Sequence, residues 1–193
     1  LADQWPSAII TKLTGAATRI GFDFPKRRHP AWRFCHTALA STEQHNQQHT
    51  VQQNLSILAP LGLAIDDAPA KMGYSDQDWR ASRALLPEEF QDNYIVIQPT
   101  SRWFFKCWRE ARMSALINAL SDAGYPVVLT SGPDAREKQM IDTIMAGCPD
   151  ARLHSLAGLL TLRQLASVID HARLFIGVDS VPMHMAAALG TPL

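Results

Sequence analysis

From residue 93 onward, short runs of aliphatic and β-branched residues alternate with longer amphipathic stretches. The runs at 94–97, 127–130 and 174–176 are almost entirely apolar, which is typical of strands buried on both faces of a sheet. Between them, residues 109–123, 135–146 and 162–171 carry their apolar side chains at helical spacing. Strands that alternate with helices of this length form βαβ units, so we expect an α/β fold with a parallel, doubly wound sheet.

The segment after the last of these strands carries the clearest candidate site. It runs through Asp179 and Ser180 into a predicted helix that has Pro182 in its first turn and stops at Gly190. Asp179, Ser180 and His184 are therefore expected at the carboxyl end of a strand, where open α/β sheets bind ligands. The start of a helix there suits a phosphate. The alternative is that Asp179 only caps the helix and His184 is a packing residue.

The loops after the preceding strands are expected at the same edge of the sheet. Thr100, Ser101 and Lys106 follow the first strand, and Gly132 and Asp134 follow the second. Two hydroxyls and an ammonium group beside a helix start are what a diphosphate needs, since stabilising a departing phosphate is the main requirement of nucleotide-sugar transfer. The alternative for Lys106 is a solvated surface lysine.

The composition excludes several classes of protein. The chain has 18 Lys and Arg against 18 Asp and Glu, which argues against a dedicated nucleic-acid binder, and no apolar run approaches a membrane span. Three scattered cysteines fit reduced thiols better than disulfides. We expect no metal site, because 76–78 (Asp-Gln-Asp) is predicted to cap a helix and the pair at 45 and 49 (both His) lacks an accompanying Glu.

The first part of the chain is organised differently. Residues 1–63 contain candidate elements at 8–13, 18–22 and 50–61, separated by a segment at 24–33 that is predicted to be an exposed basic loop. Residues 64–92 are predicted to form a crossover to the regular part at 93–193. The chain starts at Leu1 and stops just after a predicted helix, so we expect it to be part of a longer protein.

Three of these stretches together resemble the ADP-heptose:lipopolysaccharide heptosyltransferases. They are 98–108, with Gln98-Pro99-Thr100-Ser101 and Lys106 to Trp108; 130–134; and 177–188, with an Asp-Ser-x-Pro-x-His signature at 179–184. Within this family they are most similar to the branch that adds the branching heptose of the inner core. Residues 3–5 and 54–62 fit as well, so the resemblance runs through the chain.

The resemblance implies a GT-B glycosyltransferase with two Rossmann-like lobes. Residues 1–63 would be the remainder of the N-terminal acceptor lobe, 64–92 the interlobe crossover, and 93–193 the C-terminal lobe that binds the nucleotide sugar, incomplete at its end. The implied reaction is an inverting, metal-independent transfer of heptose from ADP-heptose to the inner core of lipopolysaccharide, with no cofactor. The implied place is the cytoplasm, peripheral at the inner membrane face.

The resemblance also assigns site residues. Those implied for donor binding are Thr100, Ser101, Lys106, Gly132, Asp134, Asp179, Ser180 and His184, with Lys106 and His184 also supporting catalysis. The general base would be an aspartate in a segment that this chain does not contain, so the chain alone is expected to be incomplete for catalysis. By chemistry alone, Asp3, Asp23 and Asp66 could serve, but surface carboxylates are far commoner.

The basic segment has a proposed partner as well. Because the family's acceptor is a phosphorylated lipid at a membrane surface, we expect the cations there to meet acceptor phosphates or the membrane; they are Lys26, Arg27, Arg28 and Arg33. Two alternatives to the heptosyltransferase hypothesis stay open. One is a GT-B transferase that uses another nucleotide sugar, and the other is a non-catalytic nucleotide-binding fragment.

Overall fold

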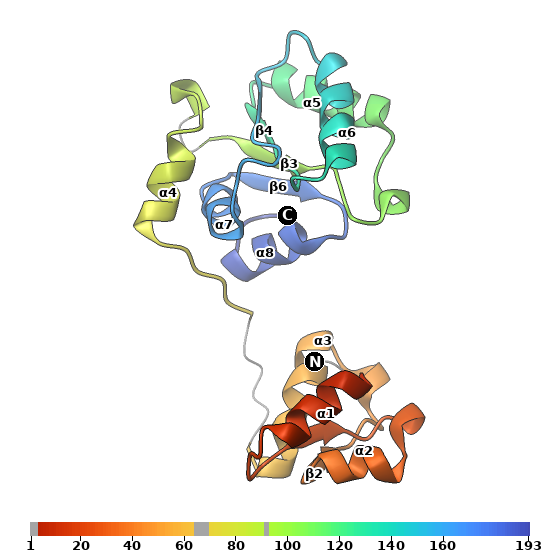
Figure 1. Ribbon diagram of the computed structural model, residues 1–193. Helices are drawn as coiled ribbons and strands as arrows, with labels where there is room; N and C mark the ends of the chain where they lie inside the picture. The colour runs from red at the N-terminus through yellow and green to blue at the C-terminus, as the bar shows by residue number, and fades with distance from the viewer. Residues whose placement is uncertain (1–3, 64–69, 91–92) are drawn as a thin grey trace. The chain divides into compact units, whose positions relative to one another are not determined.

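The computed structural model describes residues 4–63, 70–90 and 93–193 (Figure 1). The chain divides into two compact units, Leu1–Pro69 and Ala70–Leu193. The segment predicted as a crossover is shared between them: residues 70–90 belong to the second unit, whereas 64–69 and 91–92 lie outside the described residues. None of the described helices is long and apolar enough to cross a bilayer.

The first unit is built on two short parallel strands, β1 (Ile20–Phe22) and β2 (Ala38–Ala40). Helix α1 (Trp5–Leu13) packs on α2 (Pro30–Cys35), and their contact buries Ala8 and Trp32. The remaining elements are short: η1 (Pro25–Arg27), η2 (His45–Gln47), α3 (Thr50–Leu55) and η3 (Ser56–Leu61). The helix predicted at 50–61 is thus an α-helical turn continued by a 3₁₀ helix.

The segment at 24–33 differs from the exposed loop that the sequence predicts. It forms η1 and the first part of α2, and Pro25 and Pro30 each open one of these elements, as proline does where the backbone N–H has no helical partner. Trp32 is only 2% exposed, and its indole N–H donates to the Phe22 carbonyl at 3.2 Å. A buried tryptophan therefore fixes this segment to β1, although the cations around it remain at the surface.

The second unit contains one four-stranded parallel sheet in the order β5-β4-β3-β6. This confirms the α/β prediction. The strands are β3 (Ile95–Gln98), β4 (Val127–Leu129), β5 (Leu153–Ser155) and β6 (Leu174–Gly177). The helices are α4 (Asp76–Arg83), α5 (Glu110–Asp122), α6 (Ala135–Ala146), α7 (Leu162–Asp170) and α8 (Val181–Leu189), with short 3₁₀ segments η4 (Glu88–Phe90) and η5 (Phe104–Lys106).

Helices cover both faces of this sheet, with α5 and α6 on one side and α4, α7 and α8 on the other (Figure 1). The strands supply alternate residues to the two layers, as the period of two requires. In β3, Val96 joins the core under α7 and α8, whereas Ile95 and Ile97 join the core under α5 and α6. Both faces are apolar because both are covered.

The α4 segment is an integral part of the second unit. Helix α4 packs along α7, and the Tyr74 hydroxyl just before α4 donates to the Asp170 carboxylate at the end of α7, at 2.5 Å. Ser75 caps α4 in a capping box with Asp78, whose side chain accepts from the Ser75 N–H at 2.9 Å. The Asp-Gln-Asp sequence therefore forms the first turn of α4. The N-cap itself is Ser75, and of the predicted capping residues only Asp78 takes part, as its partner in the capping box.

Candidate active site

The sheet order creates a crevice at one defined place. From β3 the chain proceeds through β4 to β5 on one side, and β6 returns to the other side of β3. In open α/β sheets, ligands bind outside the carboxyl ends of the strands at such a switch point. The loops that follow β3 and β6 flank this point, and they contain the two stretches that the sequence singles out.

A pocket of about 610 Å³ occupies this position. It is lined by residues that follow β3, β4 and β6, and by the start of α7: Gln98, Thr100, Ser101, Arg102, Trp103, Ser131, Gly132, Pro133, Glu137, Leu160, Thr161, Leu162, Leu165, Asp179, Ser180, Val181 and Pro182. The lining therefore mixes aromatic and aliphatic side chains with polar ones. A pocket of this size and mixed character accommodates a small organic ligand with several polar groups.

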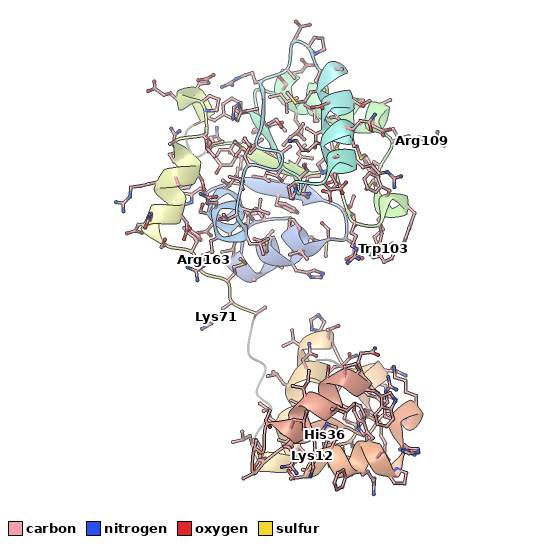
Figure 2. All side chains as sticks on the ribbon, in the orientation of Figure 1. Lys12, His36, Lys71, Trp103, Arg109 and Arg163 are labelled. Atoms are coloured by element: carbon pink, nitrogen blue, oxygen red, sulfur yellow. The ribbon has the colours of Figure 1, made fainter. Side chains whose placement is uncertain are left out.

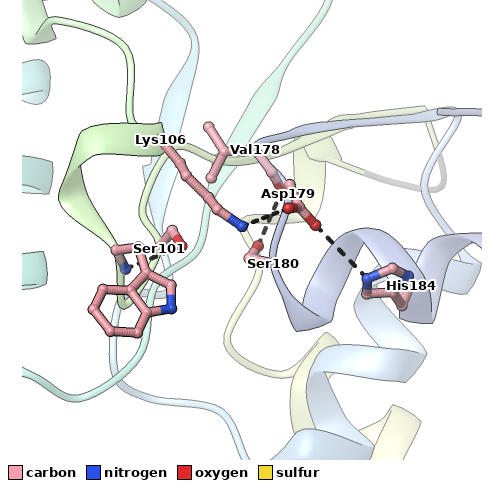
Figure 3. Close-up of polar contacts among 7 residues, drawn as sticks. Ser101, Lys106, Val178, Asp179, Ser180 and His184 are labelled. Atoms are coloured by element: carbon pink, nitrogen blue, oxygen red, sulfur yellow. Dashed lines mark hydrogen bonds and ion pairs between the residues drawn. The ribbon is translucent and has the colours of Figure 1, made fainter. Parts of the chain in front are cut away.

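An ion pair stands at the pocket between the two flanking loops. Lys106 Nζ donates to Asp179 Oδ2 at 2.5 Å, and His184 Nε2 lies 3.8 Å from the other carboxylate oxygen (Figure 3). The hydrogen bond from Lys106, then its charge, and to a smaller degree the charge of His184 hold the pKa of Asp179 below its usual value. The His184 side chain is 71% exposed, so it is not the packing residue of the alternative interpretation.

Helix α8 begins at the pocket without a side-chain cap. Ser180 is the N-cap residue, but its hydroxyl donates to the Val178 carbonyl at 3.1 Å and accepts nothing from α8. Asp179 binds Lys106 and does not cap the helix either. The positive end of the α8 dipole is thus available to an anion in the pocket.

A chain of buried and part-buried hydrogen bonds links the polar residues at one side of the pocket. Thr130 donates to Gln98 at 2.7 Å, Gln98 donates to Thr100 at 2.8 Å, and Thr100 donates to Glu137 at 2.6 Å. The same Glu137 oxygen also accepts the Gly132 N–H at 3.0 Å. Glu137 therefore holds the loop after β3 against the turn after β4, and the Thr100 hydroxyl hydrogen is engaged in that link.

The structure brings most of the predicted donor-site residues together. The pocket lining includes Thr100, Ser101, Gly132, Asp179 and Ser180, and Lys106 reaches it through Asp179. Ser101 accepts from the Trp103 N–H at 3.3 Å and keeps its own hydroxyl hydrogen as a donor.

Around the turn after β4, Glu137 lines the pocket and the predicted Asp134 does not. Asp134 caps α6 by accepting from the Arg136 and Glu137 N–H groups, and it does not line the pocket. Glu137, which the sequence analysis passed over, does line it. Glu137 lies three residues after the cap, in the first turn of α6, a position that does not by itself distinguish it from an ordinary first-turn carboxylate.

The four predicted cations of the first unit have different surroundings. Lys26 Nζ lies 5.5 Å from the Phe24 ring, and Arg27 lies 5.8 Å and 5.6 Å from the Trp5 and Trp32 rings. The other two, Arg28 and Arg33, line a separate hollow together with Asp23, His29 and Pro30. Two of the three aspartates considered as bases, Asp3 and Asp66, lie outside the described residues. In the described ranges, no group of three or more His, Cys, Asp or Glu could hold a metal ion.

Comparison with known proteins identifies the family of this chain. The model of the family described as "Glycosyltransferase family 9 (heptosyltransferase)" matches residues 1–193. The chain is 43% identical to a lipopolysaccharide heptosyltransferase 3 of Escherichia coli over 194 residues, which include all of this chain and 56% of that protein. The chain thus spans little more than half the length of this relative.

Solved structures show the same fold at lower sequence identity. A glycosyl transferase of family 9 from Veillonella parvula superposes with a TM-score of 0.80 at 17% identity, covering all of this chain and 54% of the other. The ADP-heptose lipopolysaccharide heptosyltransferase II of E. coli superposes with a TM-score of 0.77 at 20% identity, covering all of this chain and 59% of the other. The α/β architecture is therefore that of the GT-B heptosyltransferase structures, of which this chain corresponds to a part.

Proposed function

This chain belongs to glycosyltransferase family 9, the heptosyltransferases, and on that premise we propose that it carries the donor site of a transferase that moves heptose from ADP-heptose to the inner core of lipopolysaccharide. The observation that carries the proposal is the pocket at the switch point, with the uncapped start of α8 in its lining and with Lys106 bound to Asp179, which lines it. The 43% identity to an E. coli lipopolysaccharide heptosyltransferase 3 supports the choice of substrate class.

The diphosphate of the donor is proposed to lie at the start of α8. There it meets the helix dipole, the hydroxyl of Ser101 and the ammonium group of Lys106. Thr100 shapes this side of the pocket through its bond to Glu137, and Gly132 lets the backbone of the turn approach closely. Ser180 is proposed to contribute through its backbone, as the N-cap residue of α8. Asp134 is proposed to act indirectly, because it caps α6.

Asp179 is proposed to serve the sugar. A carboxylate repels a diphosphate, but it accepts hydrogen bonds strongly from hydroxyl groups, and heptose is rich in them. When the donor binds, Lys106 turns from the carboxylate to the phosphate, and sugar hydroxyls take its place on Asp179. His184, 3.8 Å from Asp179, supports the orientation of that carboxylate.

The proposed reaction is a single displacement with inversion and without a metal ion. An acceptor hydroxyl oxygen attacks the anomeric carbon, the bond from that carbon to the phosphate oxygen breaks, and ADP departs with the bonding electrons. The hydroxyl proton passes to a general base, which we place in a part of the longer enzyme outside this chain. Lys106 and the α8 dipole stabilise the charge that develops on the leaving diphosphate.

The acceptor is proposed to approach the first unit, at the cytoplasmic face of the inner membrane. The residues that carry this proposal are the cations Lys26, Arg27, Arg28 and Arg33. Each cation near an anionic lipid surface contributes about 1 kcal/mol of attraction.

Binding experiments on the full chain test the donor site. We expect calorimetry to show that ADP and ADP-heptose bind, that ADP-heptose binds more tightly than other nucleotide sugars such as UDP-glucose, and that Lys106→Ala weakens all ADP ligands. Lys71→Ala is a matched control, because Lys71 is an exposed lysine of the same unit outside the pocket lining (Figure 2). A folded chain that binds no adenine nucleotide, or loses binding equally in both variants, would refute this donor site.

A further inference from the structure

The loop after β3 carries a cluster of exposed aromatic side chains. Trp103, Phe105 and Trp108 are 59%, 81% and 56% exposed and lie close together in sequence. Single exposed aromatic residues are common, but a cluster of them typically marks a place where another molecule binds. Of the described residues that line the pocket at the switch point, Trp103 alone is aromatic. Trp103 is therefore the point at which this cluster meets the proposed donor site.

The backbone of Trp103 is held on both sides. Its N–H donates to the Ser101 hydroxyl at 3.3 Å, and its carbonyl accepts from the Lys106 N–H at 2.9 Å across η5. Arg136 of α6 lies over the Phe104 ring at 3.8 Å, a cation–π contact that ties η5 to α6. Trp103 thus has a fixed position between two residues that the proposed function places at the diphosphate.

Packing within the chain does not account for a tryptophan at this position. The indole lies at the surface of the second unit (Figure 2), and its ring centroid is 6.2 Å from that of Phe105, which is still more exposed. Trp103 belongs to none of the apolar core clusters that the described residues form. An indole that stays mostly in water gains little from folding, so its gain is expected on binding a ligand.

The part of the proposed donor that lies next to Trp103 is the sugar. Strands β3 and β6 are neighbours in the sheet, so the loops that follow them are adjacent. Asp179, which is proposed to bind sugar hydroxyls, follows β6 and contacts Lys106, three residues after Trp103. Trp103 and Asp179 both line the pocket, one from each of these loops.

An indole and a carboxylate on adjacent loops match the two kinds of surface that a sugar ring has. Hydroxyl groups around the edge of the ring donate to a carboxylate. The faces of the ring carry C–H groups, which leave water when they pack against a flat aromatic surface. A phosphate group has no such face, so the indole distinguishes the sugar from the diphosphate beside it.

We propose that Trp103 stacks on one face of the donor's sugar ring while Asp179 binds hydroxyl groups at its edge. The inference rests on the proposed function for the position of the diphosphate, and it deepens that function by naming a residue that determines affinity for the sugar. Adenine also has a flat face, so the test has to separate the base from the sugar.

The test compares ADP with ADP-heptose by calorimetry on the full chain, because both carry the base and only one carries the sugar. Trp103→Ala should weaken ADP-heptose about tenfold and leave ADP within about twofold of its original affinity, as expected for the loss of one aromatic stacking contact. Trp103→Phe retains a flat ring and should restore most of the lost affinity. Trp108→Ala is the matched control and should change neither ligand, because Trp108 is a similarly exposed tryptophan of the same segment outside the pocket lining.

Tryptophan fluorescence shows whether the contact is direct. Stacking removes water from the indole, so ADP-heptose should shift the emission to shorter wavelengths more than ADP does, and Trp103→Phe should abolish this difference.

Three results would overturn the proposal. Equal weakening of ADP and ADP-heptose by Trp103→Ala would place the base on Trp103 instead of the sugar. An unchanged affinity for ADP-heptose in Trp103→Ala, or an equal loss in Trp108→Ala, would exclude the stacking contact. If the unaltered chain bound neither ligand, the donor site itself would be wrong, whereas ADP-heptose binding that does not depend on Trp103 would refute this inference alone.

Discussion

Removing the ammonium group of Lys106 should separate its role in binding from its role in stability. Lys106 Nζ lies 2.5 Å from Asp179 Oδ2, and the two side chains are 31% and 62% exposed. Ion pairs this exposed contribute little to folding, because water screens them and both side chains lose freedom. We therefore expect Lys106→Ala to leave the urea midpoint of unfolding almost unchanged.

The effect on ligand binding should be much larger. A charge-assisted hydrogen bond from lysine to a phosphate contributes about 1.5–3 kcal/mol, which corresponds to a tenfold to hundredfold change in affinity. Part of this is offset because the phosphate must displace the Asp179 carboxylate, so the lower end of the range applies. Calorimetric titration of ADP into Lys106→Ala should show affinity reduced about tenfold.

Replacing Asp179, the partner of Lys106, should affect the binding of ADP and of ADP-heptose differently. Asp179→Asn frees Lys106 and removes a repulsive charge, so ADP should bind as tightly as before or a few times more tightly. ADP-heptose should lose affinity relative to ADP, because its hydroxyl groups lose their charged acceptor. If Asp179→Asn instead weakened ADP as strongly as Lys106→Ala does, the assignment of phosphate to Lys106 and sugar to Asp179 would be wrong.

The ion pair between Lys106 and Asp179 should also be detectable in the titration of Asp179 at acidic pH. The folded-state pKa of Asp179 is lowered, so its contribution to stability is present above the unfolded pKa and disappears as the pH falls through the folded pKa. Carboxyl-carbon NMR should show the Asp179 pKa rising toward its ordinary value in Lys106→Ala. An unchanged titration would mean that the pair does not persist in solution.

Three further variants or titrations test the framework of the second unit. Glu137→Ala should lower the free energy of unfolding by about 1–3 kcal/mol and weaken ADP as well, because it leaves the Thr100 hydroxyl and a backbone N–H without their acceptor; urea unfolding with calorimetry checks both effects. The pKa of Tyr74 is raised, chiefly by burial and then by its bond to Asp170, so this tyrosine should stay neutral at pH values where an exposed tyrosine ionises, and ultraviolet titration at 295 nm against Tyr74→Phe should show it absent from the normal step. Gly177→Ala places a Cβ about 2.6 Å from a core phenylalanine ring and should destabilise the chain by about 1–3 kcal/mol, measured as a lowered melting temperature.

The sequence predicts the second unit well because its signals are local. Buried strands such as Ile95–Gln98 show a continuous apolar run, and Gly190 ends α8 in the left-handed conformation that its position after the helix suggests. The βαβ rule then predicts which loops share the carboxyl edge of the sheet. It brings together the loops after β3 and β6, so that Lys106 meets Asp179, 73 residues further along the chain.

The missed features depend on contacts between distant residues. Glu137 meets Thr100 across 37 positions, and nothing in the helix sequence distinguishes it from an ordinary first-turn carboxylate. Trp32 lies among prolines and cations that indicate a loop, yet its burial depends on α1, for which the sequence analysis names only a candidate element at 8–13. Local patterns therefore predict elements and edges, whereas tertiary packing decides which side chains share a site.

The packing of α4 on α7 links the beginning of the second unit to the pocket. Helix α4, the first helix of the second unit, lies along α7. The Tyr74 hydroxyl, just before α4, donates to Asp170 at the end of α7. The first turn of α7 contributes Leu162 and Leu165 to the lining of the pocket at the switch point of the sheet. Because α4 packs on the same helix that lines the pocket, the packing of α4 and the shape of this pocket both depend on the position of α7.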